Sequence, residues 1–303
     1  MNQKALITGA TGYIGAKLCQ RLLTEGWQVD VLIRDTGRPL AEALIGKVTP
    51  HFYDGSTQSV QAAVAAANPD VVFHLASLFI AEHHSEQVTD LINSNLLFGT
   101  QLAEACARTG VKRFINTGTS WQHYRSDGYD PVCLYAATKQ AFEDILDFYA
   151  DAFGMRVITL KLFDTYGSDD PRPKLVNLLV NAMKTGEALG MSPGEQLLDL
   201  VHIDDVTRAF AIAAQQLLDD ASSRSHERYA VSSGTPISVR QLVALLEQVT
   251  GKANNVTYGA RPYREREVMS PWQSRKTLPG WRAQIGTIEG LAAMGLPLVP
   301  NAA

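Results

Sequence analysis

Three glycines spaced three residues apart constrain the start of this chain most strongly. Gly9, Gly12 and Gly15 follow an apolar run at 5–7 and precede an amphipathic stretch that reaches residue 25. The pattern predicts a strand, a tight turn and the start of a helix. Because glycine has no Cβ, such a turn lets a pyrophosphate approach the backbone amides, and the helix dipole favours an anion there. We therefore predict a dinucleotide site, with an ordinary glycine turn as the alternative.

Apolar runs alternate with helical patterns along the chain. The runs lie at 5–7, 29–33, 71–75, 114–115 and 157–160, and helices are expected near 14–25, 58–67, 85–109, 136–152, 172–185, 203–219 and 239–250. Apolar strands that alternate with helices are typical of a parallel sheet covered on both faces. We predict an α/β fold, a Rossmann-like doubly wound parallel sheet, with a further short strand at 199–203.

The local composition of the sequence changes after Gly167. Segments rich in Pro, Asp and Gly at 168–173 and 190–194 are typical of loops. We expect residues 1–166 to form an NADP(H)-binding Rossmann domain, to which 199–228 returns. The remaining parts, 167–198 and 229–303, are expected to form a smaller, discontinuous substrate-binding region.

Composition argues against several classes of partner. The formal net charge is −4, and the three cysteines lie far apart without a C-x-x-C pair. We therefore expect no nucleic-acid surface, reduced thiols and no metal site. No apolar run approaches about 18 residues, and the first strand begins within a few residues of the start. These features predict no membrane span, no signal peptide and a cytoplasmic location.

Tyr135 and Lys139 stand four residues apart on a predicted helix, so both side chains lie on one face. A tyrosine hydroxyl titrates near pH ~10, and a neighbouring ammonium lowers its pKa toward the range useful for acid–base chemistry. A chance spacing on a solvated helix face is the alternative. Upstream, Thr119 and Ser120 follow the strand at 114–115, at the edge where parallel sheets bind ligands.

The order of these motifs resembles one family along nearly the whole chain. The motifs are GATGYIG at 9–15, VFHLA at 72–76, Asn95 ahead of a Gly-Thr pair, Thr119, Y-x-x-x-K at 135–139 and VHIDD at 201–205. They resemble the extended short-chain dehydrogenase/reductases that act on nucleotide sugars, the NAD-dependent epimerase/dehydratase family. The resemblance implies Tyr135 as general acid and base, Lys139 as its electrostatic partner and ribose ligand, and Thr119 as the hydroxyl that orients the substrate.

The resemblance also implies where the cofactor binds. Asn95 is the expected structural asparagine, and Asp54 with Gly55 the expected pair on the adenine side. A turn or capping role is the alternative for each. The other expected cofactor contacts are Gly9, Thr11, Gly12, Tyr13, Ile14, Gly15, Leu75, Ala76, Ser77, Tyr135 and Lys139.

The end of the second strand bears on the choice of cofactor. The strand at 29–33 runs into Arg34, and Arg38 follows closely. An arginine at this position suits the 2′-phosphate of NADP(H), whereas an acidic residue binds the ribose hydroxyls of NAD. We expect NADP(H). The alternative is NAD, bound by Asp35 beside an exposed Arg34.

Two departures from the family pattern narrow the expected reaction. Thr119 is followed by Ser120 and Trp121, where nucleotide-sugar 4,6-dehydratases have the aspartate and glutamate that carry out elimination. We therefore expect no dehydratase activity. Where many relatives have an arginine and an asparagine, this chain has Lys161 and Asp164, so the usual amide contact to the sugar diphosphate is in question.

A bound diphosphate needs positive charge, and the densest basic segment lies at 261–266. Guanidinium groups suit phosphates geometrically, and Arg264 resembles the arginine of the family's R-x-x-E-V segment. We expect Arg264 first, then Arg261, to contact the diphosphate; an ion-paired surface loop is the alternative. The other expected substrate contacts are Ser120, His123 and Asp164.

The expected reaction is NADP(H)-dependent reduction of the C4 ketone of a nucleoside-diphosphate deoxyhexose, in deoxysugar and surface-polysaccharide synthesis. A local likeness of 134–146 to the CDP-abequose synthase-like reductases favours a CDP-sugar. One alternative is an epimerase of the UDP-glucose 4-epimerase type, and a weaker one is a cofactor-sensing protein without turnover. The family resemblance also implies a homodimer through the helices near 92–108 and 136–152.

Overall fold

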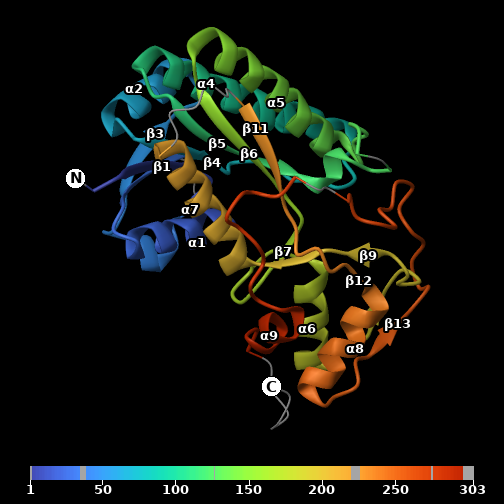
Figure 1. The fold of residues 1–303 in the computed structure, drawn as a ribbon. Helices are drawn as coiled ribbons and strands as arrows, with labels where there is room; N and C mark the ends of the chain where they lie inside the picture. Colours follow the sequence, from blue (N-terminus) through green and yellow to red (C-terminus); the bar gives the residue numbers. More distant parts are fainter. Residues whose placement is uncertain (1, 35–38, 126, 220–225, 274–275, 296–303) are drawn as a thin grey trace.

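A seven-stranded parallel sheet forms the centre of the larger part of the molecule (Figure 1). The computed structural model describes residues 2–295 except 35–38, 126, 220–225 and 274–275. The strand order is β11-β6-β5-β4-β1-β2-β3. In chain order the strands are β1 (Lys4–Thr8), β2 (Gln28–Arg34), β3 (Thr49–Tyr53), β4 (Val71–His74), β5 (Arg113–Thr119), β6 (Arg156–Leu162) and β11 (His226–Val231). The predicted α/β fold class is confirmed.

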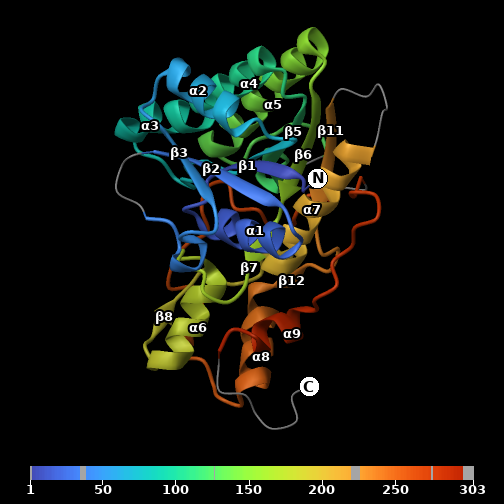
Figure 2. The same ribbon diagram turned by 90° about the vertical axis from the view of Figure 1, so that its left-hand side faces the viewer.

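Helices cover both faces of this sheet, as a doubly wound fold requires (Figures 1 and 2). One face packs against α1 (Tyr13–Thr24) and α7 (Ile203–Asp219), the other against α2 (Thr57–Ala67), α4 (Phe98–Thr109) and α5 (Leu134–Phe153). The inner strands are buried on both faces because apolar side chains point to both cores, while the edge strand β3 is partly exposed. This packing fixes α5, the helix that carries Tyr135 and Lys139, against the sheet.

The segment predicted as one helix at 85–109 is interrupted. A 3₁₀ turn at Ser85–Gln87 leads into α3 (Val88–Ile92), a π-helical segment at Asn93–Leu97 and then α4. Inserted π turns of this kind are common at functional sites. The π segment holds Asn95, whose side chain is buried and bonded away from the helix.

A smaller region lies beyond the carboxyl ends of the strands (Figure 1). It contains α6 (Leu175–Thr185), α8 (Val239–Thr250), α9 (Thr287–Ala292) and the short strands β7 (Asp164–Tyr166), β8 (Leu189–Gly190), β9 (Leu197–Leu198), β10 (Leu200–His202), β12 (Ile237–Ser238) and β13 (Val256–Thr257). Its helices share a core of their own that includes Leu179, Leu242 and Leu291. Pro173 explains why α6 begins later than predicted, since a proline disfavours the helical conformation of the residue before it.

The last strand of the sheet crosses the boundary that the sequence predicted at 228. β11 runs to Val231, and Ala230 forms a bridge to Thr277. Leu278 and Trp281 pack together with α7 into the core between the sheet and the helices α1 and α7, which is called the first core below. The C-terminal part of the chain is therefore shared between the large sheet and the smaller region. Among the helices of the described residues, none combines the length and apolarity needed to cross a bilayer.

Candidate active site

The glycine turn has the geometry that a bound phosphate needs. Gly9 adopts φ +77°, and the Gly12 amide donates to the Gly9 carbonyl at 2.9 Å. A Cβ at Gly9 would lie 2.7 Å from the Ala76 amide nitrogen, and one at Gly15 would overlap the Gly9 carbonyl oxygen. The helix begins at Tyr13 without a side-chain cap, so its first amides remain available to an anion. These residues fit the pyrophosphate of a dinucleotide.

The ends of β1 and β4 are joined next to this turn. The Thr8 hydroxyl lies 2.9 Å from His74 Nδ1 and accepts the Ala76 amide at 3.2 Å, while the Leu75 amide donates to the Thr8 carbonyl at 3.3 Å. Burial, followed by the charge of Lys139, lowers the pKa of His74 to about 3, so its ring is neutral at neutral pH. The predicted cofactor contacts Leu75 and Ala76 therefore border the glycine turn directly.

The first residues of α1 connect the turn to the loop after β7. The Tyr13 hydroxyl donates to the Ser168 carbonyl at 3.0 Å, and the Arg172 guanidinium lies 5.0 Å from the Tyr13 ring centre. Ile14 packs against the first core, and Thr11 lies within the turn, half-buried. Tyr13 thus acts as a structural link between the dinucleotide turn and the smaller region.

Asn95 ties the segment after β4 to the catalytic helix. Its Oδ1 accepts from the Leu78 amide at 2.8 Å and the Ser77 hydroxyl at 3.1 Å. Its Nδ2 donates to the Leu78 carbonyl and to the Thr138 hydroxyl, both at 3.0 Å. Because Thr138 precedes Lys139, this one side chain fixes the position of the active-site face of α5 relative to β4.

Tyr135 is half-buried at the start of α5. Its ring stands edge-on to Phe79 with centroids 5.0 Å apart. Burial raises the pKa of Tyr135, while the Ser77 hydroxyl and the charge of Arg172 oppose that rise. The side chain is therefore protonated at neutral pH in the absence of ligand, which is the state a proton donor needs.

Lys139 is 1% exposed and lies one helical turn beyond Tyr135. Burial lowers its pKa to about 8, and the Glu143 carboxylate opposes that effect. The ammonium therefore keeps its charge at neutral pH by a small margin. Its position on the same helix face lets it act on the same bound groups as Tyr135.

Thr119 ends β5 and faces this helix. Its hydroxyl accepts from the Trp121 amide at 3.3 Å, and its own amide donates to Gln122 Oε1 at 2.9 Å. A hydroxyl that accepts one hydrogen bond still has its proton to donate. Phe79 bridges the two sides of the site, because its ring lies 5.4 Å from Trp121 and 5.0 Å from Tyr135.

Two cations lie over these aromatic rings. The Arg264 guanidinium is 5.1 Å from the Trp121 ring centre, and Lys174 Nζ is 4.4 Å from that of Phe79. Arg264 also pairs with Glu267 through Nε, at 3.0 Å, and one terminal nitrogen, at 2.9 Å. Of the two arginines expected to bind a diphosphate, the structure places Arg264 beside the site.

The charges of the same two cations act on Asp164. Burial raises the pKa of its carboxyl group, while Lys174 and Arg264 oppose the rise. Its amide donates to the Asp199 carbonyl at 3.0 Å, which starts β7 beside the smaller region. Arg261, by contrast, is exposed and contacts that region through its amide, which donates to the Met191 carbonyl at 3.1 Å.

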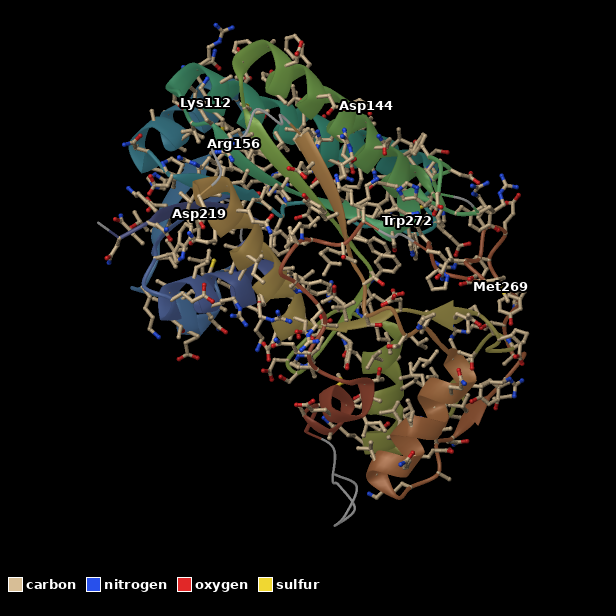
Figure 3. All side chains as sticks on the ribbon, viewed as in Figure 1. Lys112, Asp144, Arg156, Asp219, Met269 and Trp272 are labelled. Atoms are coloured by element: carbon tan, nitrogen blue, oxygen red, sulfur yellow. The ribbon has the colours of Figure 1, made fainter. Side chains whose placement is uncertain are left out.

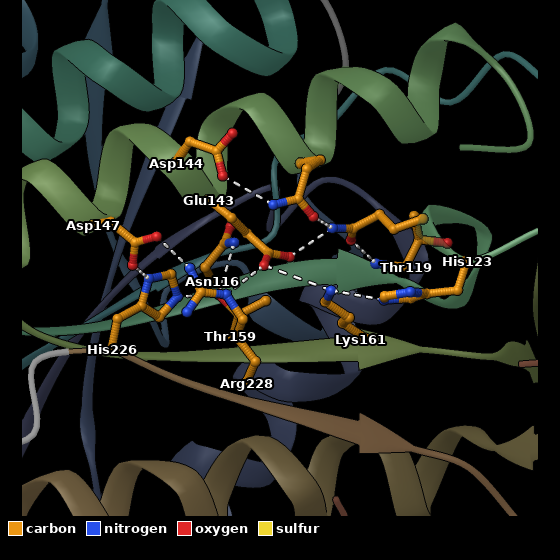
Figure 4. Close-up of polar contacts among 12 residues, drawn as sticks. Asn116, Thr119, His123, Glu143, Asp144, Asp147, Thr159, Lys161, His226 and Arg228 are labelled. Atoms are coloured by element: carbon orange, nitrogen blue, oxygen red, sulfur yellow. Dashed lines mark hydrogen bonds and ion pairs between the residues drawn. The ribbon is translucent and has the colours of Figure 1, made fainter. Parts of the chain in front are cut away.

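His123 is held by contacts within the protein. Its ring stacks on Trp272 at 3.9 Å, its Nε2 lies 2.9 Å from Lys161 Nζ, and its Nδ1 lies 2.9 Å from the Gly128 carbonyl (Figures 3 and 4). Burial and then Lys161 lower the pKa of His123, so the neutral ring accepts from Lys161 and donates to Gly128. Both ring nitrogens are thus engaged within the protein, and the sugar contact of His123 stays a prediction. Its neighbour Ser120 is 9% exposed.

The adenine side shows a turn at the predicted pair. Asp54 Oδ1 accepts the Ser56 amide at 2.9 Å, and hydrogen bonds from Ser56, then Ser59, lower the pKa of Asp54 to about 2. Gly55 adopts φ +100°. Asp54 therefore fills the turn role that was its alternative. Arg34 is exposed at the end of β2, next to Tyr53. Asp35 and Arg38 lie outside the described residues.

Three residues near the catalytic groups were not predicted. Phe79 and Lys174 lie on loops that follow β4 and β7, and Glu143 lies one turn beyond Lys139. The signal for the loops was their place after strands, since ligands bind at the carboxyl ends of parallel strands. For Glu143 the signal was its spacing of four from Lys139. Within the described residues no group of three His, Cys, Asp or Glu side chains is placed to hold a metal ion.

A family model matches most of the chain. The model of the NAD-dependent epimerase/dehydratase family matches residues 5–227, well over half of the 303-residue chain. The chain belongs to this family. The predicted family is thereby confirmed, and the groups assembled around Tyr135, Lys139 and Thr119 form the candidate active site of one of its enzymes.

Curated relatives of two kinds match almost the whole chain. A CDP-abequose synthase from Yersinia pseudotuberculosis is 28% identical over 269 residues, which cover 88% of this chain and 91% of the relative. A UDP-glucose 4-epimerase from Mycolicibacterium smegmatis is 25% identical, over 95% of this chain and 96% of the relative. Among solved structures, MoeE5 in complex with UDP-glucuronic acid and NAD is similar, with a TM-score of 0.83, 27% identity and coverage of 96% and 97%.

The glycine turn yields the first prediction. A Cβ at Gly12 would lie 3.2 Å from the Gly9 carbonyl oxygen, so a larger side chain fits the fold with a small shift but covers the amides of the turn. We expect Gly12→Val to weaken NADH and NADPH binding roughly 10-fold or more, measured by fluorescence titration. Gly286→Ala, in open space at a negative φ, is the matched control. Unchanged affinity in a folded Gly12→Val protein would contradict the assignment.

Proposed function

We propose that the enzyme is an NADPH-dependent reductase of the C4 ketone of a nucleoside-diphosphate deoxyhexose, with a CDP-sugar favoured. The observation that carries the proposal is the trio Tyr135, Lys139 and Thr119 without a carboxylate next to Thr119. The 28% identity to a CDP-abequose synthase over most of both chains supports the same class. Such enzymes serve deoxysugar and surface-polysaccharide synthesis.

In this mechanism each catalytic residue has a separate task. A reduced nicotinamide, when bound, supplies the hydride for the carbonyl carbon. Tyr135, protonated at neutral pH, gives its proton to the developing alkoxide, while the Thr119 hydroxyl donates a hydrogen bond to the same oxygen. Lys139 binds a ribose hydroxyl and stabilises the phenolate that Tyr135 becomes. The net change is a ketone reduced to an alcohol, with one hydride and one proton added.

The aromatic wall supports a deoxyhexose as substrate. Phe79 and Trp121 place their rings beside Tyr135 and leave apolar surface there, with Phe79 44% exposed. A sugar with a methyl group at C6 fits an apolar surface better than one with a hydroxyl or carboxylate, because a buried polar group needs a partner. Ser120 and Trp121 also replace the acid pair that elimination requires.

Positive charge for the diphosphate comes from the loops of the smaller region. Lys174 and Arg264 flank Asp164, so a bound diphosphate would meet two cations and one carboxyl group. We propose that 167–198 and 229–303 hold the nucleotide sugar, with Arg264 as the principal arginine. The carboxyl of Asp164 stands where many relatives have an amide donor, and burial raises its pKa while Lys174 and Arg264 oppose the rise.

A second candidate is an epimerase that retains its NAD(P). The 25% identity to a UDP-glucose 4-epimerase over nearly the whole chain favours it. An epimerase returns the hydride to the opposite face of C4, which requires the ketosugar to turn over in the site. Phe79 and Trp121, packed against Tyr135 and Thr119, restrict that space and favour the reductase.

The proposed reaction predicts a specific loss in a tyrosine variant. The purified protein should consume NADPH with one of the CDP-, UDP-, GDP- or dTDP-linked 4-ketosugars and form a product heavier by two hydrogens. Tyr135→Phe should lower kcat by roughly 10²- to 10⁴-fold, because it removes the proton donor, with NADPH affinity nearly unchanged. A variant that keeps full turnover would exclude Tyr135 as the acid, and an isomeric product would favour the epimerase.

The position of Arg34 predicts the preference between the two cofactors. We propose that its guanidinium, exposed at the end of β2, binds the 2′-phosphate of NADPH. Arg34→Ala should raise KM for NADPH about 10-fold and leave KM for NADH within about twofold, since only NADPH carries that phosphate. Arg21→Ala, on α1 and bonded to Glu25 and Thr207, is the control. Equal effects on both cofactors would contradict the proposal.

Exposed apolar side chains on one set of helices predict the assembly. Val88, Ile92, Leu97 and Phe148 are 38%, 37%, 49% and 58% exposed on α3, the π segment and α5. We propose that these helices pair in a homodimer. A Leu97→Asp, Phe148→Asp double variant should sediment as a monomer. Charges buried in an apolar interface make the free energy of dimer formation less favourable by roughly several kcal/mol. Ile45 is 65% exposed but lies outside these helices, so Ile45→Asp should leave the mass of the assembly in sedimentation unchanged. A monomeric native protein would refute the pairing.

A further inference from the structure

One face of α5 carries a row of polar side chains that continues past the catalytic pair. Tyr135, Lys139, Glu143 and Asp147 follow one another at intervals of four residues, so they lie along one line of the helix. The Glu143 side chain is fully buried, and Asp147 at the far end is half exposed. Figure 4 shows Glu143 and Asp147 between the helix and the strands of the sheet.

The Glu143 carboxylate is satisfied by side chains from three other elements. Its Oε1 accepts from Gln122 Nε2 at 2.8 Å. Its Oε2 accepts from Arg228 Nε at 2.9 Å and lies 3.7 Å from Lys161 Nζ. Gln122 follows β5, Lys161 lies on β6 and Arg228 on β11. A single buried carboxylate thus joins α5 to three neighbouring parts of the sheet.

The contact with Gln122 reaches the catalytic threonine. The side chain of Gln122 is buried. Its Nε2 donates to Glu143, and its Oε1 accepts from the Thr119 backbone amide at 2.9 Å. An amide side chain whose donor end is fixed by a carboxylate has its acceptor end fixed as well. Gln122 Nε2 also donates to Gln140 Oε1 at 2.8 Å, so the carboxylate and Gln140 together fix which way Gln122 points, and with it the position of the Thr119 amide at the end of β5.

The same carboxylate is the anion nearest Lys139 on the helix, and it opposes the effect of burial on the Lys139 ammonium. Other charged or titratable groups surround the pair on every side. These are Asp144 and Asp147 on α5, His74 on β4, His123 after β5, Lys161 on β6, and His226 and Arg228 on β11.

We propose that Glu143 is a positioning residue for the reaction: through Gln122 it holds Thr119 in place, and its charge, one helical turn from Lys139, acts on the Lys139 ammonium. The inference rests on the proposed function, because it assigns Thr119 and Lys139 their roles in ketone reduction. It adds a group that touches neither substrate nor cofactor and acts through the two that do.

Three variants of the full-length enzyme test the two parts of this proposal separately: the link through Gln122 to Thr119, and the effect of the Glu143 charge on Lys139. Glu143→Gln keeps an oxygen that can accept from Gln122 but removes the charge. Gln122→Met breaks the link to Thr119 and keeps the charge. Asp147→Asn is the matched control, because it lies on the same row and is bonded to Arg228 but does not contact Gln122. Gln122→Met also tests the proposal if Glu143→Gln, which leaves Lys161 and Arg228 less compensated, does not fold.

The expected results differ between the variants. With NADPH and the 4-ketosugar that the native enzyme reduces, Gln122→Met should lower kcat roughly 10- to 100-fold, because Thr119 is displaced, with KM for NADPH within about twofold. Glu143→Gln should move the basic limb of the kcat profile about one pH unit lower, because Lys139 then loses its proton sooner. Asp147→Asn should change neither kcat nor the pH of its basic limb. If both variants behave like Asp147→Asn, the proposal is overturned.

NADPH titration without sugar makes the test independent of turnover. In the native enzyme, NADPH binding should weaken as Lys139 deprotonates above about pH 8, and Glu143→Gln should move that loss to lower pH. If no 4-ketosugar is reduced but the binding profile shifts, the proposed function fails and the positioning role stands. If a 4-ketosugar is reduced but neither profile shifts and kcat of Gln122→Met is unchanged, the positioning role fails alone.

Discussion

The buried carboxylate of Glu143 organises the active-site end of this molecule. A charge removed from water is tolerated only where partners compensate it, and here the partners come from the loop after β5, from β6 and from β11. The requirement draws the catalytic helix and the edge of the sheet into one arrangement. Tyr135 and Lys139 lie on the same helix, so the positions of these two side chains depend on the hydrogen bonds and ion pairs of the Glu143 carboxylate.

The dinucleotide turn and the catalytic spacing could be predicted from the sequence because both depend on local physics. Gly9 and Gly15 have neighbours that a Cβ would strike, and Tyr135 and Lys139 share a face because a helix repeats every 3.6 residues. The parallel strands with continuous apolar runs were predicted for a similar reason. β11 was missed because its first residues, His226 to Arg228, are polar although the strand pairs with β6.

What the sequence did not predict depends on contacts between distant segments. His123 was interpreted as a sugar ligand, but Trp272, from the far end of the chain, covers its ring, and Lys161 occupies one of its nitrogens. Lys174 and Phe79 meet only when the loops after β7 and β4 fold together. No local pattern encodes such pairs, since they are set by tertiary packing.

The departures from the family pattern gain a physical meaning in the structure. Lys161 stands where many relatives have an arginine, and it divides its single ammonium between Glu143 and His123. Trp121 replaces an acid of the dehydratases and, with Phe79, gives the site an apolar wall beside Tyr135. The loss of the acid pair fits the proposed ketone reduction better than the elimination of water.

The central claim is net hydride transfer to C4 of a nucleotide-linked ketosugar, and deuterium labelling tests it most directly. The purified enzyme would be incubated with NADPH carrying deuterium on the transferred position and a CDP-4-keto-6-deoxyhexose. The account predicts one deuterium at C4 of the product and one oxidised cofactor for each sugar reduced. An isomerised sugar without deuterium from the added NADPH, and without net oxidation of it, would contradict the account and identify an epimerase.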